Sequence, residues 1–487
     1  MTAGQAHSRV VTGARGAVSA AHPLAVSAGT GALADGGSAL DAAVAAQAVI
    51  CVLMPQAGGL GGDLMALVRQ PDGVVVAVNG AGRAPRALRR AGADGGASVT
   101  VPGLVDGWAR AHRRWGRLPL SRVLRPAVEL AEHGVPVDAA LARAVATHRH
   151  RLERGGAAGW PLLDLAAGDR WRQPELAALL CDVADRGREA LHAGPTAAAV
   201  VAAARRYGGE LSEADLAGHQ TAVGPAVAVD WAGGRLHVQP PSSQGVLLAM
   251  AARWLHRHPP APGEDLDHLL VEVTEAAFRH RDDCARGAAL LAEPLSVDRQ
   301  RARRLGGPRA YLHTAGVATA DAAGQVVSSL VSVFDDFGSG VYVPEAGLVL
   351  NNRAGGFTGG ANAAAPGALP VHTLAPAVVE LPGAALALAT PGADGQVQTL
   401  LQILARMRYA GADLASAVAA PRWRSQGGEL LVEDDHPGRA GLAGRGHVVR
   451  DVSAGDEVFG AAVAAGTGAT GPFAAADWRR LVWSGVV

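Results

Sequence analysis

The chain has 487 residues, of which 49% are hydrophobic and only 4% aromatic, so a sizeable core must be filled mainly by Ala, Val and Leu. Its 44 Lys+Arg residues balance its 44 Asp+Glu residues, and this zero net charge argues against nucleic acid as the main partner. All the Lys+Arg residues are arginine, which excludes a lysine Schiff base, a lysine general base and a phosphate-binding P-loop lysine.

The first part of the chain is predicted to be mainly helical. An Ala-rich helix pair is expected between Pro23 and Cys51. It is divided at Asp35-Gly36-Gly37-Ser38, where the glycines end one helix and Ser38 caps the next. Further predicted elements are a glycine-rich loop at Gly58 to Gly62, a hairpin of Leu64 to Val68 and Val74 to Asn79, a mostly helical region from Pro102 to about Gly218, strands within Ala226 to Val238, and a helix from His268 to Arg281.

Strands dominate after an Arg-rich connector that runs from Leu290 to about His313. The predicted elements are strands at Thr314 to Asp321, Gln325 to Phe334, Gly347 to Asn351 and Ala384 to Thr390, and a helix at Gln396 to Ala410. Because helices are grouped first and strands later, the order favours a layered α+β fold over a repeated βαβ fold.

The three cysteines, Cys51, Cys181 and Cys284, are odd in number and far apart, so neither a disulfide framework nor a zinc cluster is expected from them. The first 20 residues contain no apolar core of signal-peptide length. A run of about 18 apolar residues is also absent from the sequence. We therefore expect a soluble, cytoplasmic protein with no membrane partner.

Thr314 is a candidate N-terminal nucleophile. It opens a predicted strand, and cleavage of the bond between His313 and Thr314 would give one residue both a hydroxyl nucleophile and a free α-amine that acts as its base. Many strands begin with threonine, so this pattern alone is a weak signal, and it gains weight only from the motifs around it.

A series of short motifs occurs in one order along the chain. They are His22-Pro23-Leu24-Ala25, Gly36-Gly37-Ser38-Ala39-Leu40-Asp41-Ala42-Ala43-Val44-Ala45, Gly58-Gly59-Leu60-Gly61-Gly62, Gly82-Arg83-Ala84-Pro85, Val101-Pro102-Gly103-Leu104-Val105-Asp106-Gly107-Trp108, Gly116-Arg117-Leu118-Pro119, Arg125-Pro126-Ala127-Val128-Glu129-Leu130-Ala131, Pro240-Pro241-Ser242-Ser243-Gln244-Gly245, Gly338-Ser339-Gly340-Val341, Leu350-Asn351-Asn352 and Thr390-Pro391-Gly392. From His22 to about Gln426 the chain therefore resembles the γ-glutamyltranspeptidase family.

The resemblance implies a four-layer αββα sandwich of the N-terminal nucleophile hydrolase type. It also implies one precursor that cuts itself before Thr314 into a large segment, residues 1–313, and a small segment, residues 314–487, which stay associated. Thr314 would be the nucleophile and Ser332 its supporting hydroxyl. The backbone N–H groups of Gly392 and Ala393 would form the oxyanion hole. Alanine can serve at position 393 if the turn needs no positive φ there.

The departures from the family lie in substrate recognition. The acid that holds a glutamyl α-amino group is replaced by Gly356. A family Gln becomes Arg353, and a family Asn becomes Phe334, which is followed by Asp335 and Asp336. Loss of a buried carboxylate partner for an ammonium costs about 2–5 kcal/mol. An ordinary γ-glutamyl group should therefore bind poorly.

Other pocket positions are also changed. The family's paired serines become His372 and Thr373. The only candidate for the family arginine that binds the substrate carboxylate is Arg83, which lies closer to the following Pro than the family residue does. The gained Arg353 favours a carboxylate or another planar anion, although it could instead face solvent or pair with Asp335 or Asp336.

We expect an autoprocessed Thr hydrolase or acyltransferase that acts on a small acidic metabolite and needs no cofactor. The resemblance is closest to an acylase-like branch. It points to specialised-metabolite biosynthesis, with hydrolytic cleavage of a carbon–carbon bond, as in 4-alkylproline pathways, as one form of the reaction. Two alternatives stay open: a true γ-glutamyl hydrolase or transpeptidase, and an unprocessed binding pseudoenzyme. The pseudoenzyme alternative stays open because the small Ala315-Gly316 follows Thr314, where the family has bulkier residues.

Three residues of one predicted helix have spacing that could suit metal ligands: His268, Glu272 and Glu275. The resemblance instead implies a packing helix at this place, so the sequence prediction is that no metal is bound.

Overall fold

Two seven-stranded sheets form the centre of the molecule. The computed structural model of the chain describes residues 9–306, 314–480 and 482–487. The first sheet has the order β21 (Trp483–Val486), β2 (Gly16–Ala20), β10 (Ala315–Asp321), β11 (Val326–Ser332), β3 (Asp63–Arg69), β4 (Val75–Gly80) and β7 (Ala222–Pro225). The second has the order β1 (Val10–Thr12), β20 (Gly471–Ala476), β19 (Val463–Gly468), β15 (Ala384–Ala389), β14 (Ala377–Leu381), β9 (Gly234–Val238) and β8 (Val227–Trp231).

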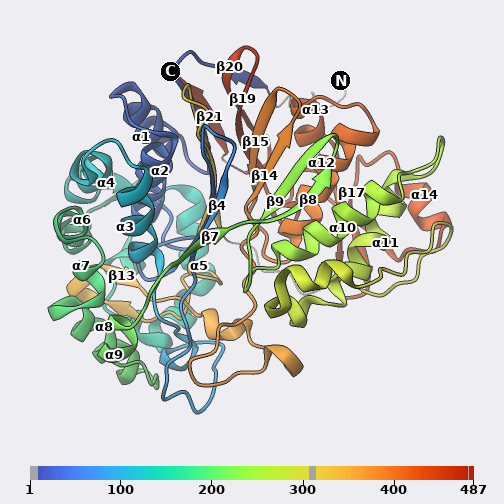
Figure 1. Cartoon of the computed structure of the whole chain (residues 1–487). Helices are drawn as coiled ribbons and strands as arrows, with labels where there is room; N and C mark the ends of the chain where they lie inside the picture. The colour runs from blue at the N-terminus through green and yellow to red at the C-terminus, as the bar shows by residue number, and fades with distance from the viewer. Residues whose placement is uncertain (1–8, 307–313, 481) are drawn as a thin grey trace.

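Helices cover the outer face of each sheet, which gives four layers (Figure 1). The helices on the side of the first sheet are α1 (Pro23–Ala34), α2 (Ala39–Leu53), α3 (Leu104–Trp115), α4 (Leu120–His133) and α6 (Pro174–Arg186). Those on the side of the second are α10 (Gly245–Arg257), α11 (Leu266–Phe278) and α12 (Gly395–Tyr409). The arrangement confirms the predicted αββα sandwich.

The remaining elements surround these layers. The helices are α5 (Ala139–Leu152), α7 (Glu189–His192), α8 (Gly194–Arg206), α9 (Glu213–Ala217), α13 (Leu414–Ala419) and α14 (Arg439–Gly444). The strands are β5 (Val135–Pro136), β6 (Arg170–Trp171), β12 (Tyr342–Val343), β13 (Leu348–Val349), β16 (Trp423–Gln426), β17 (Glu429–Glu433) and β18 (Val449–Val452). Within the described ranges, no helix combines the length and the apolar character needed to cross a bilayer.

Small side chains fill the space between the two sheets. The buried cluster there is rich in alanine, and its members include Ala17, Ala77, Ala318, Ala320, Ala385, Ala387, Ala389 and Ala465. A Cβ on Gly316 of β10 would lie 3.0 Å from Val463 Cγ2 and 3.3 Å from Ala389 Cβ of the second sheet. Gly316 is therefore small because β10 packs closely against β15 and β19, which explains why this position lacks a larger side chain. Ala315 points to the opposite face, into the core beneath the helices.

The predicted helix pair is present, with its division where expected. The Ser38 hydroxyl accepts the N–H of Asp41 at 3.1 Å, and Asp41 Oδ2 accepts the N–H of Ser38 at 2.8 Å, so the two residues form a complete capping box. The predicted hairpin is also present, as β3 and β4. In contrast, β14 was not predicted, and the strand expected to reach Phe334 ends at Ser332 because Phe334 has a φ of +87°.

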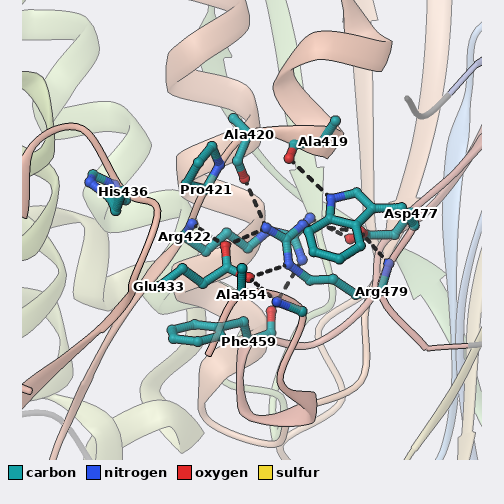
Figure 2. Close-up of polar contacts among 12 residues, drawn as sticks. Ala419, Ala420, Pro421, Arg422, Glu433, His436, Ala454, Phe459, Asp477 and Arg479 are labelled. Atoms are coloured by element: carbon teal, nitrogen blue, oxygen red, sulfur yellow. Dashed lines mark hydrogen bonds and ion pairs between the residues drawn. The ribbon is translucent and has the colours of Figure 1, made fainter. Parts of the chain in front are cut away.

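A buried network of arginines and carboxylates stabilises the end of the chain (Figure 2). Arg479 binds Glu433 through two parallel contacts, Nε to Oε1 at 2.8 Å and Nη2 to Oε2 at 2.5 Å. Asp477 accepts from Arg479 Nη1 at 3.1 Å and from Arg422 Nη2 at 2.5 Å. All four side chains are fully buried, so the planar guanidinium forks keep these charges paired where the end of β17, the segment before β16 and the segment after β20 meet.

We predict that Ser38→Ala lowers the free energy of unfolding by about 1 kcal/mol, because the first turn of α2 loses its cap. Urea unfolding measures the change. Ser27→Ala on the exposed side of α1 is the matched control, and it should shift the midpoint little. Equal effects of the two substitutions would contradict a role for the capping box.

Candidate active site

Thr314 lies directly before β10, in the middle of the first sheet. Ala315 pairs with Val331 of β11, so Thr314 is opposite Ser332 at the end of the same strand pair. The Thr314 hydroxyl donates to Ser332 Oγ at 3.3 Å, and both residues are buried. Ser332 Oγ also accepts the N–H of Phe334 at 2.9 Å, which fixes its position. The structure thus brings together the two hydroxyl residues that the sequence proposed. His313 lies outside the described residues.

A cavity of about 450 Å³ lies beside Thr314. Its lining residues include Thr314, Met54, Arg143 and Pro391. Pro391 begins the turn whose N–H groups were predicted to form the oxyanion hole. The cavity is therefore lined both by Thr314 and by the first residue of the predicted oxyanion turn.

The turn Pro391-Gly392-Ala393 is held by side chains on its carbonyl groups. Arg424 Nη2 donates to the Gly392 carbonyl at 3.0 Å, and Gln244 Nε2 donates to the Ala393 carbonyl at 2.9 Å. These contacts fix the peptide planes immediately before the N-terminus of α12, where backbone N–H groups favour negative charge.

The turn does not meet the condition under which alanine was expected to serve at position 393. Ala393 has a φ of +46° and Gly392 a φ of +117°. A left-handed alanine costs roughly 1–2 kcal/mol. The contact of Gln244 with its carbonyl and the start of α12 hold Ala393 in this conformation.

Arg353, Asp63 and His372 form a fully buried group next to the Ser332 end of the sheet. Arg353 Nε lies 3.0 Å from Asp63 Oδ2, and His372 Nε2 lies 3.1 Å from the same oxygen. Arg353 Nη1 is 3.4 Å from Thr373 Oγ1. The partner of Arg353 is therefore Asp63, rather than solvent or the hydrogen-bonded carboxylates of Asp335 or Asp336 considered from the sequence.

The charges within this group are set by burial and by the contacts between its members. Burial raises the pKa of Asp63, but the His372 hydrogen bond and the Arg353 charge outweigh it and hold that pKa below its usual value. Burial, helped by the Arg353 charge, lowers the pKa of His372 from 6.5 to about 4. His372 is therefore neutral near pH 7. Its Nδ1 accepts the N–H of Leu374 at 3.2 Å, so Nε2 carries the proton and donates to Asp63.

The space expected for a glutamyl-binding acid is filled differently here. The Phe334 ring centroid lies 4.4 Å from Arg353 Cζ, a cation–π arrangement. A Cβ on Gly356 would lie 3.2 Å from the Val371 carbonyl oxygen and 4.0 Å from the Phe334 ring. A side chain at position 356 would thus press on the Val371 carbonyl oxygen, whereas its Cβ would only touch the Phe334 ring.

The remaining predicted residues have other contacts. Asp335 accepts from Asn352 Nδ2 at 2.8 Å, and burial raises its pKa. Arg83 is exposed, donates to the Gly367 carbonyl at 3.0 Å and lines a separate cavity whose lining residues do not include Thr314. The structure therefore does not place Arg83 at the nucleophile.

Sequence reasoning missed Asp63, Gln244 and Arg424. For Asp63 a signal existed, because a carboxylate that opens a mainly apolar strand must have a buried partner. The glycine loop before it has a structural role. A Cβ on Gly61 would lie 2.1 Å from the Val349 carbonyl oxygen and one on Gly62 2.4 Å from the Ser332 carbonyl oxygen, so only glycine allows this loop to support β11.

Comparison with known proteins agrees with this geometry. Residues 25–482 match the gamma-glutamyltranspeptidase family. The chain belongs to this family. The oxamate amidohydrolase proenzyme of Klebsiella pneumoniae is 32% identical over 444 residues, which cover 83% of this chain and 84% of the relative. A glutathione hydrolase-like proenzyme, YwrD, of Bacillus subtilis is 32% identical over 505 residues, which cover 93% and 95%.

Solved structures give the same result. The crystal structure of a cephalosporin acylase from Bacillus halodurans superposes with a TM-score of 0.87 at 27% identity, covering 100% of this chain and 99% of that one. This γ-glutamyltranspeptidase-family protein is therefore an enzyme, an N-terminal nucleophile hydrolase, and the proenzyme names of its relatives fit autoprocessing.

We predict that Thr314→Ala leaves the chain uncut before position 314 and without turnover, as seen by mass spectrometry of the purified protein. Ser332→Ala should slow both reactions about tenfold, the effect of one lost hydrogen bond to the nucleophile. In the control, Ser328→Ala on the same strand removes a hydroxyl that donates to the Leu388 carbonyl, and should alter stability alone. A Thr314→Ala protein that is still cut before position 314 would exclude this nucleophile.

A second prediction concerns pH. Because the folded-state pKa of His372 is about 4 and the unfolded value 6.5, the unfolded chain binds the extra proton between these values. Stability should therefore fall as the pH drops from 6.5 towards 4, and this residue should add a slope of at most about 1.4 kcal/mol per pH unit. His372→Asn keeps an acceptor for Leu374 and should remove that part of the slope in urea unfolding. His256→Asn, an exposed control, should not.

Proposed function

We propose that the protein cuts itself between His313 and Thr314 and that the new N-terminal threonine hydrolyses an amide of a small, carboxylate-bearing metabolite. The observation that carries this proposal is the Thr314–Ser332 hydroxyl contact beside a cavity that also reaches the oxyanion turn. The products of self-cleavage would be the segments 1–313 and 314–487.

The two segments should stay associated because the first sheet is built from both. β10 of the small segment pairs with β2 of the large one, and β11 pairs with β3. The contact of Arg353 with Asp63 also joins them, and separation would leave both charges unpaired. Self-cleavage can then release the Thr314 amine without loss of the fold.

The proposed reaction begins when the Thr314 hydroxyl attacks the carbonyl carbon of the substrate and its own α-amine accepts the hydroxyl proton. Ser332 holds the attacking oxygen in place. The backbone N–H groups of Gly392 and Ala393, at the start of α12, receive the developing oxyanion. The amine then leaves with the proton, and water, or another amine in a transferase reaction, resolves the acyl-enzyme.

An acidic substrate is proposed because of the group around Arg353. Asp63 binds its Nε, whereas Nη2 is buried and, within the described part of the chain, donates no hydrogen bond. A carboxylate can satisfy such a donor, whereas an ammonium would be repelled by it. The relative named oxamate amidohydrolase supports this substrate class, because oxamate is a small amide that carries a carboxylate.

The alternatives are less consistent with the site. A γ-glutamyl α-ammonium would meet Gly356 and Phe334 in place of an acid, which disfavours the γ-glutamyl hydrolase hypothesis. An unprocessed pseudoenzyme is disfavoured because the small Gly316 is explained by packing against the second sheet, which needs no loss of self-cleavage. Attack on an activated ketone would use the same Thr314 hydroxyl and the same oxyanion turn. Cleavage of a carbon–carbon bond in specialised metabolism is therefore the second reaction that we propose for this site.

A substrate panel tests the proposal with the processed protein. It contains oxamate, an uncharged amide of similar size, a γ-glutamyl anilide and an acidic β-diketone. We expect turnover of a carboxylate-bearing compound and little release from the anilide. Robust turnover of the anilide would contradict the claim that this site binds a γ-glutamyl group poorly. Turnover of the diketone alone would favour carbon–carbon cleavage over amide hydrolysis.

We further predict that Arg353→Gln raises the KM for the acidic substrate about 30-fold or more and leaves turnover of an uncharged amide much less affected. The control is Arg83→Gln, which removes an exposed arginine from the separate cavity and should change KM little. Because Arg353→Gln leaves Asp63 buried and unpaired, a double variant with Asp63→Asn separates stability from recognition: it should regain stability but not the low KM.

A further inference from the structure

Two histidines and a glutamate from distant parts of the chain meet in the interior, away from the strands that carry Thr314 and Ser332. His268 and Glu272 lie one turn apart on α11, and His447 follows α14. His268 Nδ1 is 2.8 Å from His447 Nε2, and these nitrogens and a Glu272 carboxylate oxygen all lie within 4.8 Å of one another. All three side chains are buried, with exposed fractions of 0%, 1% and 7% for His268, Glu272 and His447.

The hydrogen bonds around His268 fix which of its nitrogens has a lone pair. Its Nε2 lies 3.1 Å from the Asp298 carbonyl oxygen, which can only accept, so Nε2 carries the proton. Nδ1 therefore presents a lone pair towards His447 and Glu272. A histidine that donates one ring N–H to a backbone carbonyl and directs its other nitrogen inward has the usual arrangement of a metal ligand.

Glu272 directs a second set of lone pairs into the same place. Its Oε1 accepts the N–H of Arg303 at 2.9 Å. Its Oε2 is buried and, among the described residues, accepts no hydrogen bond. A buried carboxylate oxygen without a donor is costly, so an external ligand that binds oxygen would stabilise it.

We propose that His268, Glu272 and His447 form a binding site for a single divalent transition-metal ion of the Zn²⁺ type. Two imidazoles and one carboxylate are ligands that Zn²⁺ accepts in proteins. His447 becomes a ligand by moving its ring proton from Nε2 to Nδ1, so the ring stays neutral. The nearby Arg445 does not oppose the ion with an unpaired charge, because it lies 3.2 Å from Asp265 Oδ2.

The position of these ligands gives the ion a structural role. His268 and Glu272 precede Thr314, and His447 follows it, so the ion would join the two segments that the proposed cleavage creates. The carboxylate of Glu272 also holds the backbone at Arg303, in the connector that leads to Thr314. The ion would thus fix the large segment near its new end without taking part in the attack on a substrate.

The site also corrects the sequence-based reading of α11. Glu275, the third candidate ligand by spacing, does not join the cluster in this way; its Oε1 accepts the Ser425 hydroxyl at 2.5 Å. His447, which replaces it, is far away in the sequence, so spacing along one helix could not reveal the ligand set.

The test is calorimetric titration of the full-length, chelator-treated protein with Zn²⁺, together with the thermal unfolding temperature with and without the ion. We expect about one Zn²⁺ per chain and an unfolding temperature that rises with Zn²⁺ concentration. His447→Ala should weaken binding about 100-fold or more and abolish the temperature shift. His256→Ala, which removes an exposed histidine, should bind like the wild type.

Glu272→Gln is the second variant, in case His447→Ala does not fold. It preserves the size of the side chain and should also weaken binding, whereas circular dichroism of the chelated variant should match that of the chelated wild type. Absence of stoichiometric binding, or equal affinity in the wild type and both ligand variants, would overturn the proposal. Because the readout is metal binding, the result does not depend on whether the proposed substrate is correct.

Discussion

The antiparallel register of β10 and β11 is the constraint on which the active site depends. Pairing of Ala315 with Val331 places the Thr314 and Ser332 hydroxyls opposite each other. A shift of one residue would turn every side chain of β10 to the other face of the sheet and separate the two hydroxyls. The glycine loop at Gly61 and Gly62 and the close packing of Gly316 on the second sheet maintain this register, because larger side chains at these positions would collide with backbone or with neighbouring strands.

The proposed function combines one reaction geometry with a different substrate. The hydroxyl pair and the oxyanion turn depend on backbone positions, which tolerate changes in the surrounding side chains. Recognition depends on the side chains themselves, and here Asp63, Arg353 and His372 form a buried group with one negative and one positive charge and a neutral imidazole. In the proposed function, this group would offer a donor to an anion where a glutamyl-binding enzyme needs an acceptor for an ammonium.

Local features were predicted well from the sequence, whereas long-range pairs were not. The division between α1 and α2 could be predicted because Ser38 and Asp41 are neighbours in the chain. The αββα layers and the positions of Thr314 and Ser332 followed from the family resemblance. The partner of Arg353 could not be predicted, because Asp63 reaches it only through the pairing of β3 with β11. The positive φ of Ala393 was missed for a related reason: the contacts that stabilise it come from distant residues.

The exclusive use of arginine has a chemical consequence beyond packing. Guanidinium groups pair the buried carboxylates of Figure 2, and they do not react as primary amines at neutral pH. With no lysine in residues 1–487, a cut before Thr314 would create a primary amine in a protein that otherwise has one only at the terminus of the chain. Amine-selective reagents would then label the nucleophile almost free of background, so the appearance of this amine could be followed directly as the precursor matures.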